Sequence, residues 1–200
     1  MSSRSPAIES ALRLPADSGV HRLPNVILGT ILFVASEIMF FAALISAFTI
    51  ARSAAIGGVW PPPGQPRLPV EQTAFNTAAL LLSGIVLWAG TRHLRTAPAL
   101  AQRYVAVAIA LGVTFVSLQG VEWVALLREG LTMTSSSHGS FFYLIVGAHA
   151  LHAVAAILVL TWMYVRMVQG RIVPERFTAT RIFWYFVVVL WPVIYLRVYL

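Results

Sequence analysis

The stretch ILFVASEIMFFAALI, residues 31–45, decides the fold, because it lies at the centre of the first hydrophobic span of the chain. Glu37 stands in the middle of it, with apolar-dominated sequence on both sides. A carboxylate at the centre of a membrane span costs several kcal/mol unless another group compensates for it. The stretch therefore predicts a transmembrane helix that carries a compensated acid.

The composition agrees with a membrane protein. The 200 residues are 58% hydrophobic and only 10% charged, and the mean hydropathy is +0.80. A length of this kind predicts one domain, and such a composition is typical of an integral membrane protein. The sequence has no cysteine, which excludes disulfides and thiolate metal sites.

Five stretches are long enough to cross a hydrocarbon layer of ~30 Å at ~1.5 Å per helical residue. Each should be helical, because the bilayer core offers no water to backbone groups. We expect an all-α, polytopic bundle with spans at residues 26–51, 73–91, 104–127, 141–165 and 182–199. Residues 26–200 then form the transmembrane domain. Residues 1–25 form a short cytoplasmic tail, whose lack of an apolar core segment argues against a signal peptide.

Arginine predicts the orientation. All fourteen basic residues are arginines, and they lie beside the spans, a pattern that favours membrane topology over nucleic-acid binding. The tail, the second loop and the fourth loop hold Arg4, Arg13, Arg22, Arg92, Arg95, Arg103, Arg166, Arg171, Arg176 and Arg181. The opposite side holds Arg52, Arg67, Arg128 and Arg197. We therefore expect a cytoplasmic N terminus and an external C terminus.

Few strongly polar side chains lie within the spans, and the main ones are Glu37, Gln119, Glu122, His149 and His152. Their positions along the helices place Glu37, His149 and His152 in the middle layer, at depths of ~13–18 Å. Glu122 lies ~27 Å along its span, nearer the outer interface. Residues three apart share a helix face, so the two histidines should point the same way, as should Gln119 and Glu122.

Three interpretations of these polar residues remain open. The first is a hydrogen-bonded intramembrane cluster of Glu37, Glu122, His149 and His152 that fixes helix register, with Glu37 either neutral or half of an ion pair. The second is a proton or ion pathway, although the cytoplasmic half of the helices supplies almost no polar groups to continue it. The third is a metal site, but neither glutamate has a histidine three residues later, as carboxylate-bridged di-iron bundles require. No catalytic motif is recognised, and we expect neither a metal nor a catalytic residue in this chain.

Six short motifs then occur in an order that identifies a family. They are SEIMFFAALISAF, GGVWPPPG, NTAALLLSG, LGVTFVSLQGVEW, GSFFYLIVGAHALHAV and FWYFVVVLW. From about Leu28 onward the chain resembles subunit III of the haem–copper terminal oxidases, in the short bacterial form with five helices. The resemblance implies that Glu37 is the membrane-embedded acid of the family, that Glu122 is its second acid, and that His149 and His152 are its H-x-L-H pair.

The resemblance also implies a function. A subunit III holds no haem and no copper; it packs against the catalytic subunit I, which reduces oxygen, and it supports proton uptake and sustained turnover. The chain should then lie in the bacterial inner membrane, with haem and copper in partner subunits. The other hypotheses are a subunit-III-like component of a quinol oxidase or nitric oxide reductase system, a stand-alone proton or ion transporter, and a membrane metalloenzyme.

The last motif departs from the family pattern. Tyr185 and Val188 stand where the family usually has His and Asp, and Pro192 follows. Two polar groups are therefore missing from the interior, and Pro192 should kink the last helix because it cannot donate to the carbonyl of Val188. The arginines of the fourth loop are explained first by membrane topology. The additional hypothesis is an anionic-lipid site, with Arg166, which ends the fourth span directly, as the contact to a phospholipid headgroup.

Overall fold

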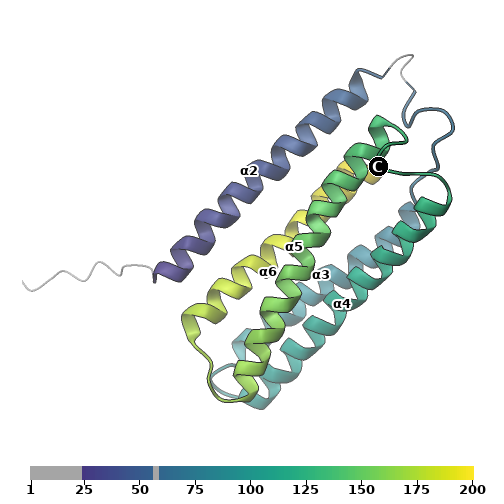
Figure 1. Cartoon of the computed structure of the whole chain (residues 1–200). Coiled ribbons are helices and arrows are strands. Elements are labelled where there is room, and N and C mark those ends of the chain that lie inside the picture. The colour runs from purple at the N-terminus through teal and green to yellow at the C-terminus, as the bar shows by residue number, and fades with distance from the viewer. Residues whose placement is uncertain (1–23, 56–58) are drawn as a thin grey trace, which may run out of the picture.

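The computed structural model describes residues 24–55 and 59–200, where all regular structure is helical (Figure 1). Five helices in these residues are long and apolar enough to cross a membrane. Their bounds are Asn25–Ser53 (α2), Val70–Arg92 (α3), Pro98–Arg128 (α4), Ser137–Val168 (α5) and Pro174–Ile194 (α6), and a short π-helix, η2 (Tyr195–Tyr199), follows α6. The predicted all-α architecture with five spans is confirmed.

Helices α2 to α5 each contain the span predicted for them and extend beyond it, whereas the span predicted at residues 182–199 is divided between α6 and η2. The largest difference is in α6, which begins at Pro174, whereas the predicted span begins at residue 182. The extra turns carry arginines and other polar residues, which a search for purely apolar stretches leaves out. The predicted tail, with Arg4, Arg13 and Arg22, lies almost wholly outside the described residues and stays a prediction.

Local sequence signals set several helix ends. Pro98 and Pro174 lie in the first turns of α4 and α6, where a missing backbone N–H does no harm. The side chain of Ser136 accepts a hydrogen bond from the backbone N–H of Gly139 and caps α5. Gly130 and Gly170 have φ of 89° and 68° and terminate α4 and α5, because glycine enters this left-handed region without strain.

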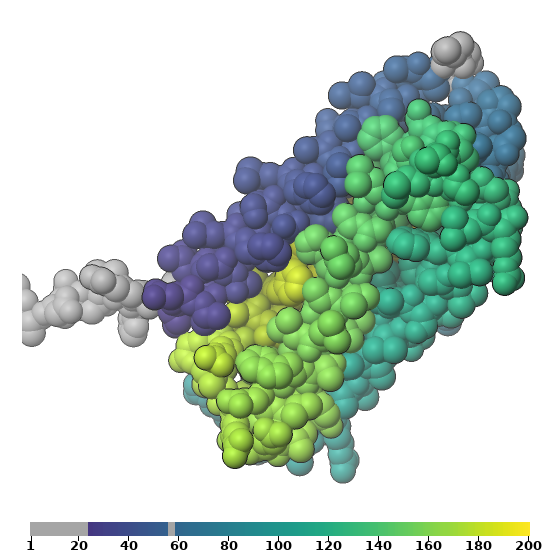
Figure 2. Space-filling model, in the orientation of Figure 1, coloured from purple at the N-terminus to yellow at the C-terminus, as the bar shows by residue number. Residues whose placement is uncertain are grey.

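The helices form two neighbouring parts of one bundle. Helices α3 and α4 lie side by side as an antiparallel pair, with α5 and α6 beside them, and α2 lies at the edge (Figure 1). Helix α2 packs mainly against α6 and α5. In the space-filling view α2 covers one long side of these two helices, and its own outer surface remains free (Figure 2).

Small residues let the inner helices approach closely. A Cβ atom at Gly112 would lie 2.5 Å from Cη2 of Trp184, so the indole of α6 occupies the space that a side chain on α4 would need. At Gly84 a Cβ atom would lie 3.0 Å from Cγ1 of Val188. Small residues at helix contacts are the usual means of close packing in membranes. Lipid solvates apolar side chains as well as another helix does, so helices associate through close contact and not through the hydrophobic effect.

The end of the last helix is irregular. Helix α6 continues through Pro192, and the π-helix begins three residues later at Tyr195. Pro192 has no backbone N–H, so the carbonyl of Val188 loses its usual donor. Wider turns of this kind are rare and re-aim the side chains that follow them. Here the turn carries Tyr199, whose ring is buried against α3, α4 and α5.

Candidate functional site

The interior acid of the first span is paired with a histidine of α5. Oε2 of Glu37 lies 3.1 Å from Nε2 of His152, and the two side chains are 19% and 15% exposed. The other ring nitrogen of His152, Nδ1, lies 2.7 Å from the carbonyl oxygen of Ala148. The compensating group that Glu37 requires is therefore His152, on the neighbouring helix.

This geometry limits the protonation states of the pair. A carbonyl oxygen can only accept, so Nδ1 of His152 carries a proton and donates it to Ala148. In a neutral ring Nε2 is then an acceptor, and Glu37 must be protonated to donate to it. If Glu37 is ionised, Nε2 must carry a proton as well. In both cases the pair holds one proton between its two members and has no net charge, which suits an apolar setting.

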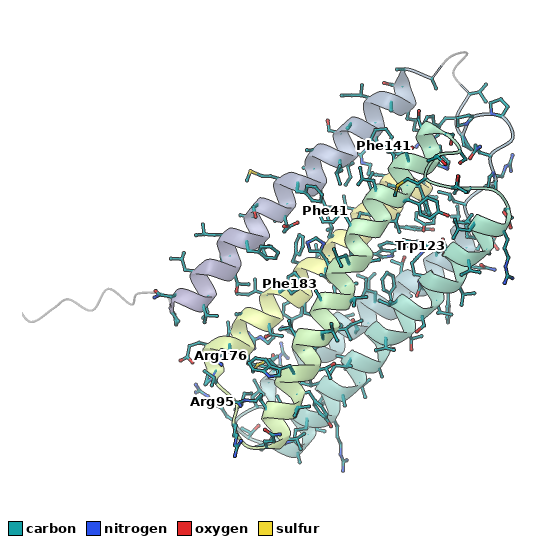
Figure 3. The ribbon with its side chains drawn as sticks, in the orientation of Figure 1. Phe41, Arg95, Trp123, Phe141, Arg176 and Phe183 are labelled. Atoms are coloured by element: carbon teal, nitrogen blue, oxygen red, sulfur yellow. The ribbon has the colours of Figure 1, made fainter. Side chains whose placement is uncertain are left out.

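Aromatic rings surround the imidazole of this pair. Phe41 and Phe33 of α2 have ring centroids 5.5 and 6.4 Å from that of His152. Phe186 and Phe183 of α6 lie at 6.2 and 6.3 Å. Figure 3 shows Phe41 and Phe183 pointing into the region where α2 meets α6. The rings restrict the access of water, so the hydrogen bond between Glu37 and His152 is stronger than it would be in solvent.

The second interior acid, Glu122, lies in a different place and bonds to α3. Its Oε2 is 2.8 Å from Oγ1 of Thr73, which also lies 2.9 Å from the carbonyl oxygen of Pro69. A hydroxyl has one proton to donate. The hydroxyl of Thr73 shares this proton between Oε2 of Glu122 and the carbonyl oxygen of Pro69, which ties Glu122 of α4 to the first turn of α3.

Further polar side chains extend this second group across three helices. Nδ2 of Asn76 donates to Oε1 of Gln119 over 3.2 Å, and Nε2 of Gln119 donates to the hydroxyl of Tyr199 over 3.0 Å. One turn away, the indole N–H of Trp191 donates to Oγ1 of Thr77 over 2.8 Å. The network therefore joins α3 and α4 to the end of α6 and to η2.

His149 belongs to neither group. It is fully buried, and neither of its ring nitrogens has a hydrogen-bond partner among the described residues. Its ring centroid lies 4.9 Å from that of Trp191 and 6.2 Å from that of Phe115. It also lines a small cavity of ≈ 120 Å³ between α4, α5 and α6. His149 and His152 lie on the same side of α5, but they contact different residues.

The structure thus divides the predicted cluster of Glu37, Glu122, His149 and His152 into three separate locations. Sequence analysis missed Thr73, Asn76 and Tyr199, which complete the second group. Threonine and asparagine near a span end carry no strong signal by themselves, since both are common at helix ends. Thr73 and Asn76 can be recognised only in the structure, where they are buried on the face of α3 that is turned toward α4.

The residues that depart from the family pattern take up packing positions. Val188 contacts the helix surface at Gly84, and it is buried. Tyr185 is partly buried, and its hydroxyl has no partner among the described residues. An aspartate at residue 188 would meet the same close surface of α3 with a charge. The apolar valine instead packs directly against α3.

Two further predicted features can be placed. Arg166, the predicted lipid contact, lies over the ring of Trp162, with its guanidinium carbon 5.9 Å from the ring centroid. Trp162 lines a groove of ≈ 340 Å³ between α2, α5 and α6, and the arginine that lines this groove itself is Arg176, not Arg166. Among the described residues we find no group of three or more His, Cys, Asp or Glu side chains arranged to hold a metal ion.

These features define a class of protein. It is a multi-pass, all-helical membrane protein whose interior polar side chains are mostly used in contacts between helices. A family model described as cytochrome c oxidase subunit III matches residues 17–200. The chain belongs to the cytochrome c oxidase subunit III family, and the recognition made from its six motifs is confirmed.

Individual relatives agree with the family model. The probable cytochrome c oxidase subunit 3 of Mycobacterium leprae (strain TN) is 31% identical over 189 residues, which cover 91% of this chain and 92% of the relative. The probable cytochrome c oxidase subunit 3 of Nocardia farcinica (strain IFM 10152) is 30% identical, with 90% and 91% covered. The cytochrome c oxidase subunit 3 of Formosania lacustris is 35% identical, with 86% of this chain and 67% of the relative covered.

Proposed function

We propose that this chain is the non-catalytic subunit III of a haem–copper respiratory oxidase, and that it packs on and stabilises the catalytic subunit I. Oxygen reduction and proton translocation are properties of the whole complex. Haem and copper belong to partner subunits, and this chain has no active site of its own. The family match supports the subunit assignment, and the use of the interior polar residues supports the non-catalytic role.

The contact between Glu37 and His152 carries the proposal. Both ring nitrogens of His152 and Oε2 of Glu37 are engaged in a local, net-neutral arrangement, and phenylalanine rings rather than polar groups surround it. A proton pathway needs a chain of polar groups that continues on both sides of the acid. The phenylalanine rings of α2 and α6 around the pair provide no such groups. They favour a hydrogen bond that fixes α2 against α5 over a proton pathway.

The test compares two substitutions of Glu37 in the full oxidase complex. Glu37→Ala leaves Nε2 of His152 without a partner, so we expect lower yield of assembled complex and faster loss of activity during turnover. Glu37→Gln keeps a side-chain N–H that can donate to Nε2 of a neutral His152. This variant should assemble and retain activity like the wild type. Oxygen uptake by the purified complex, followed over successive turnovers, measures both.

Three results would contradict the proposal. Unchanged yield and unchanged activity decay in Glu37→Ala would show that the bond has no structural role. Full assembly of Glu37→Gln with activity as poor as that of Glu37→Ala would show that the ionisable proton, and not the hydrogen bond, is what the complex requires. Haem absorption by this chain after separation from all partners would overturn the assignment of haem to other subunits.

We propose that the chain lies in a bacterial inner membrane with its N terminus in the cytoplasm and its C terminus outside. The arginine distribution supports this orientation. The odd number of helices that could span the membrane supports termini on opposite sides. A cysteine introduced near residue 96 should be protected from a membrane-impermeant thiol reagent in intact cells, whereas one near residue 134 should react. The reverse pattern would contradict the orientation.

We also propose that a phospholipid is bound at the cytoplasmic end of the bundle, near Arg166. Arg166 stacks near Trp162, which forms one wall of the groove between α2, α5 and α6. Arginine holds a phosphate through paired hydrogen bonds. If the lipid content of the purified complex is unchanged in Arg166→Ala, this arginine does not hold the headgroup.

A further inference from the structure

A polar cavity lies at the end of the bundle opposite to Arg166, where α2 and η2 end and α3 and α5 begin. It has a volume of ≈ 360 Å³, and its lining includes Arg52, Arg67, His138, Trp60 and Tyr199. This volume lies in the ~300–1,000 Å³ range of small-ligand sites. The cavity is separate from the Glu37–His152 pair, which lies near the middle of α2 and α5.

The charged side chains that line the cavity are positive. Arg52 and Arg67 both line it, and no acidic side chain does so among the described residues. Glu71, close in sequence to the cavity, lines a different groove between α3 and α4. Nη2 of Arg52 donates to the backbone carbonyl oxygen of Leu200 over 3.3 Å, which uses one of its five N–H donors. Neither guanidinium group makes another hydrogen bond to the described residues, which leaves donors of both for a ligand.

A buried histidine supplies the second, independent sign of a ligand. His138 is only 3% exposed, lines the cavity, and has no hydrogen-bond partner at either ring nitrogen among the described residues. The ring of Trp60 contacts it edge to face, with centroids 5.3 Å apart and planes at 89°, which holds the imidazole in place. Buried polar groups are nearly always paired. An imidazole held without a partner at the wall of a cavity is therefore placed to bond to what enters it.

We propose that this cavity binds a phosphate group, carried by an anionic phospholipid headgroup or present as free phosphate. Two guanidinium groups match the charge and the oxygen geometry of a phosphate. One nitrogen of a neutral His138 can donate to a phosphate oxygen, and the other can accept from a hydroxyl group of the ligand. The apolar side chains of Leu68 and Val198 in the same wall suit the glycerol and the first methylene groups of a lipid.

The test uses the full chain in the complex with which it co-purifies, in detergent. Phosphatidylglycerol, phosphatidylcholine and inorganic phosphate are titrated separately, and bound molecules on this chain are counted by native mass spectrometry. The double variant Arg52→Gln/Arg67→Gln removes both charges from exposed side chains, so folding should persist. Arg128→Gln is the matched control, because Arg128 is an exposed arginine at the same end of the bundle that does not line the cavity.

We expect a site on the wild-type chain, additional to any lipid held near Arg166, that is weakened at least tenfold in the double variant and unchanged in Arg128→Gln. Binding of phosphatidylglycerol that phosphate does not displace identifies a lipid site, and binding of phosphate alone identifies a site for the free ion. Equal binding by the double variant and the control would overturn the proposal. So would affinity for phosphatidylcholine equal to that for phosphatidylglycerol, since no negative charge would then be selected.

Discussion

Helices α2 and α3 are both long and apolar, yet they use their surfaces in opposite ways. In the most apolar window of α2 only 11% of residues are buried, against 44% in α3. The buried residues of α2 are Phe41 and Phe48, both large. Those of α3 are mostly small or polar, namely Thr73, Asn76, Thr77, Leu80, Ser83, Gly84, Leu87 and Gly90.

The difference shows how a helix is held in a membrane. Lipid is as apolar as leucine, so hydrophobicity alone does not press one helix against another. Helix α3 is held by close packing and by hydrogen bonds to α4 and α6. Helix α2 is held by the Glu37–His152 pair, by the hydrogen bond from Arg52 at its end and by a set of phenylalanine contacts, and its broad outer face is left for lipid or for another subunit.

The largest expected effect comes from adding one carbon atom to the tightly packed part. In Gly112→Ala the new methyl group would overlap the indole of Trp184, which is 2% exposed and has little room to move. Overpacking of this kind costs about 1–3 kcal/mol. The control is Gly29→Ala on α2, where no atom lies within 4 Å of the added Cβ. Unfolding of the purified protein in mixed micelles measures both, and equal stability would contradict the comparison.

A smaller effect is expected from removing the main aromatic contact of α2. Phe41 is fully buried, and Phe41→Ala removes its packing against His152 and Phe186. In water-soluble proteins such a change costs about 3–5 kcal/mol. Here the loss should be about 2 kcal/mol or less, because lipid solvates the exposed apolar surface.

The matched control for this prediction is the neighbouring residue. Phe40 is 44% exposed, and Phe40→Ala should leave stability within about 0.5 kcal/mol of the wild type. Proteolysis of the loop after α2 provides a second measurement, since a loosened α2 should be cleaved faster. If both variants behave alike, α2 is held by something other than its buried phenylalanine.

The smallest effect is expected from deleting one hydroxyl group of the second polar group. Tyr199→Phe removes the acceptor of the hydrogen bond from Nε2 of Gln119 and leaves the ring in place. One such bond is worth about 1 kcal/mol. Tyr164→Phe serves as the control, because the Tyr164 hydroxyl makes no hydrogen bond to the residues that the structure describes. A loss in Tyr199→Phe no greater than in the control would show that η2 is not tied to α4 through this bond.

Much of the candidate site was accessible from the sequence, but its grouping was not. The cost of a charge in lipid marks Glu37, Glu122, His149 and His152 as residues that need an explanation. Helical spacing places the two histidines about 60° apart around α5, on one half of the helix. That angle is wide enough for His152 to reach α2 while His149 faces Trp191 of α6. No rule of spacing decides which neighbour each imidazole meets.

The sequence by itself determined that this protein is a five-span helical membrane protein and to which family it belongs. Both follow from local properties, namely the length of apolar runs and short motifs in a fixed order. Only the tertiary structure decided that Glu37 pairs with His152, that Thr73 serves Glu122, and that Arg52, Arg67 and His138 share one cavity. Glu37 and His152, for example, are 115 residues apart in the sequence. Their meeting depends on how whole helices cross, which is set by many small packing contacts at once.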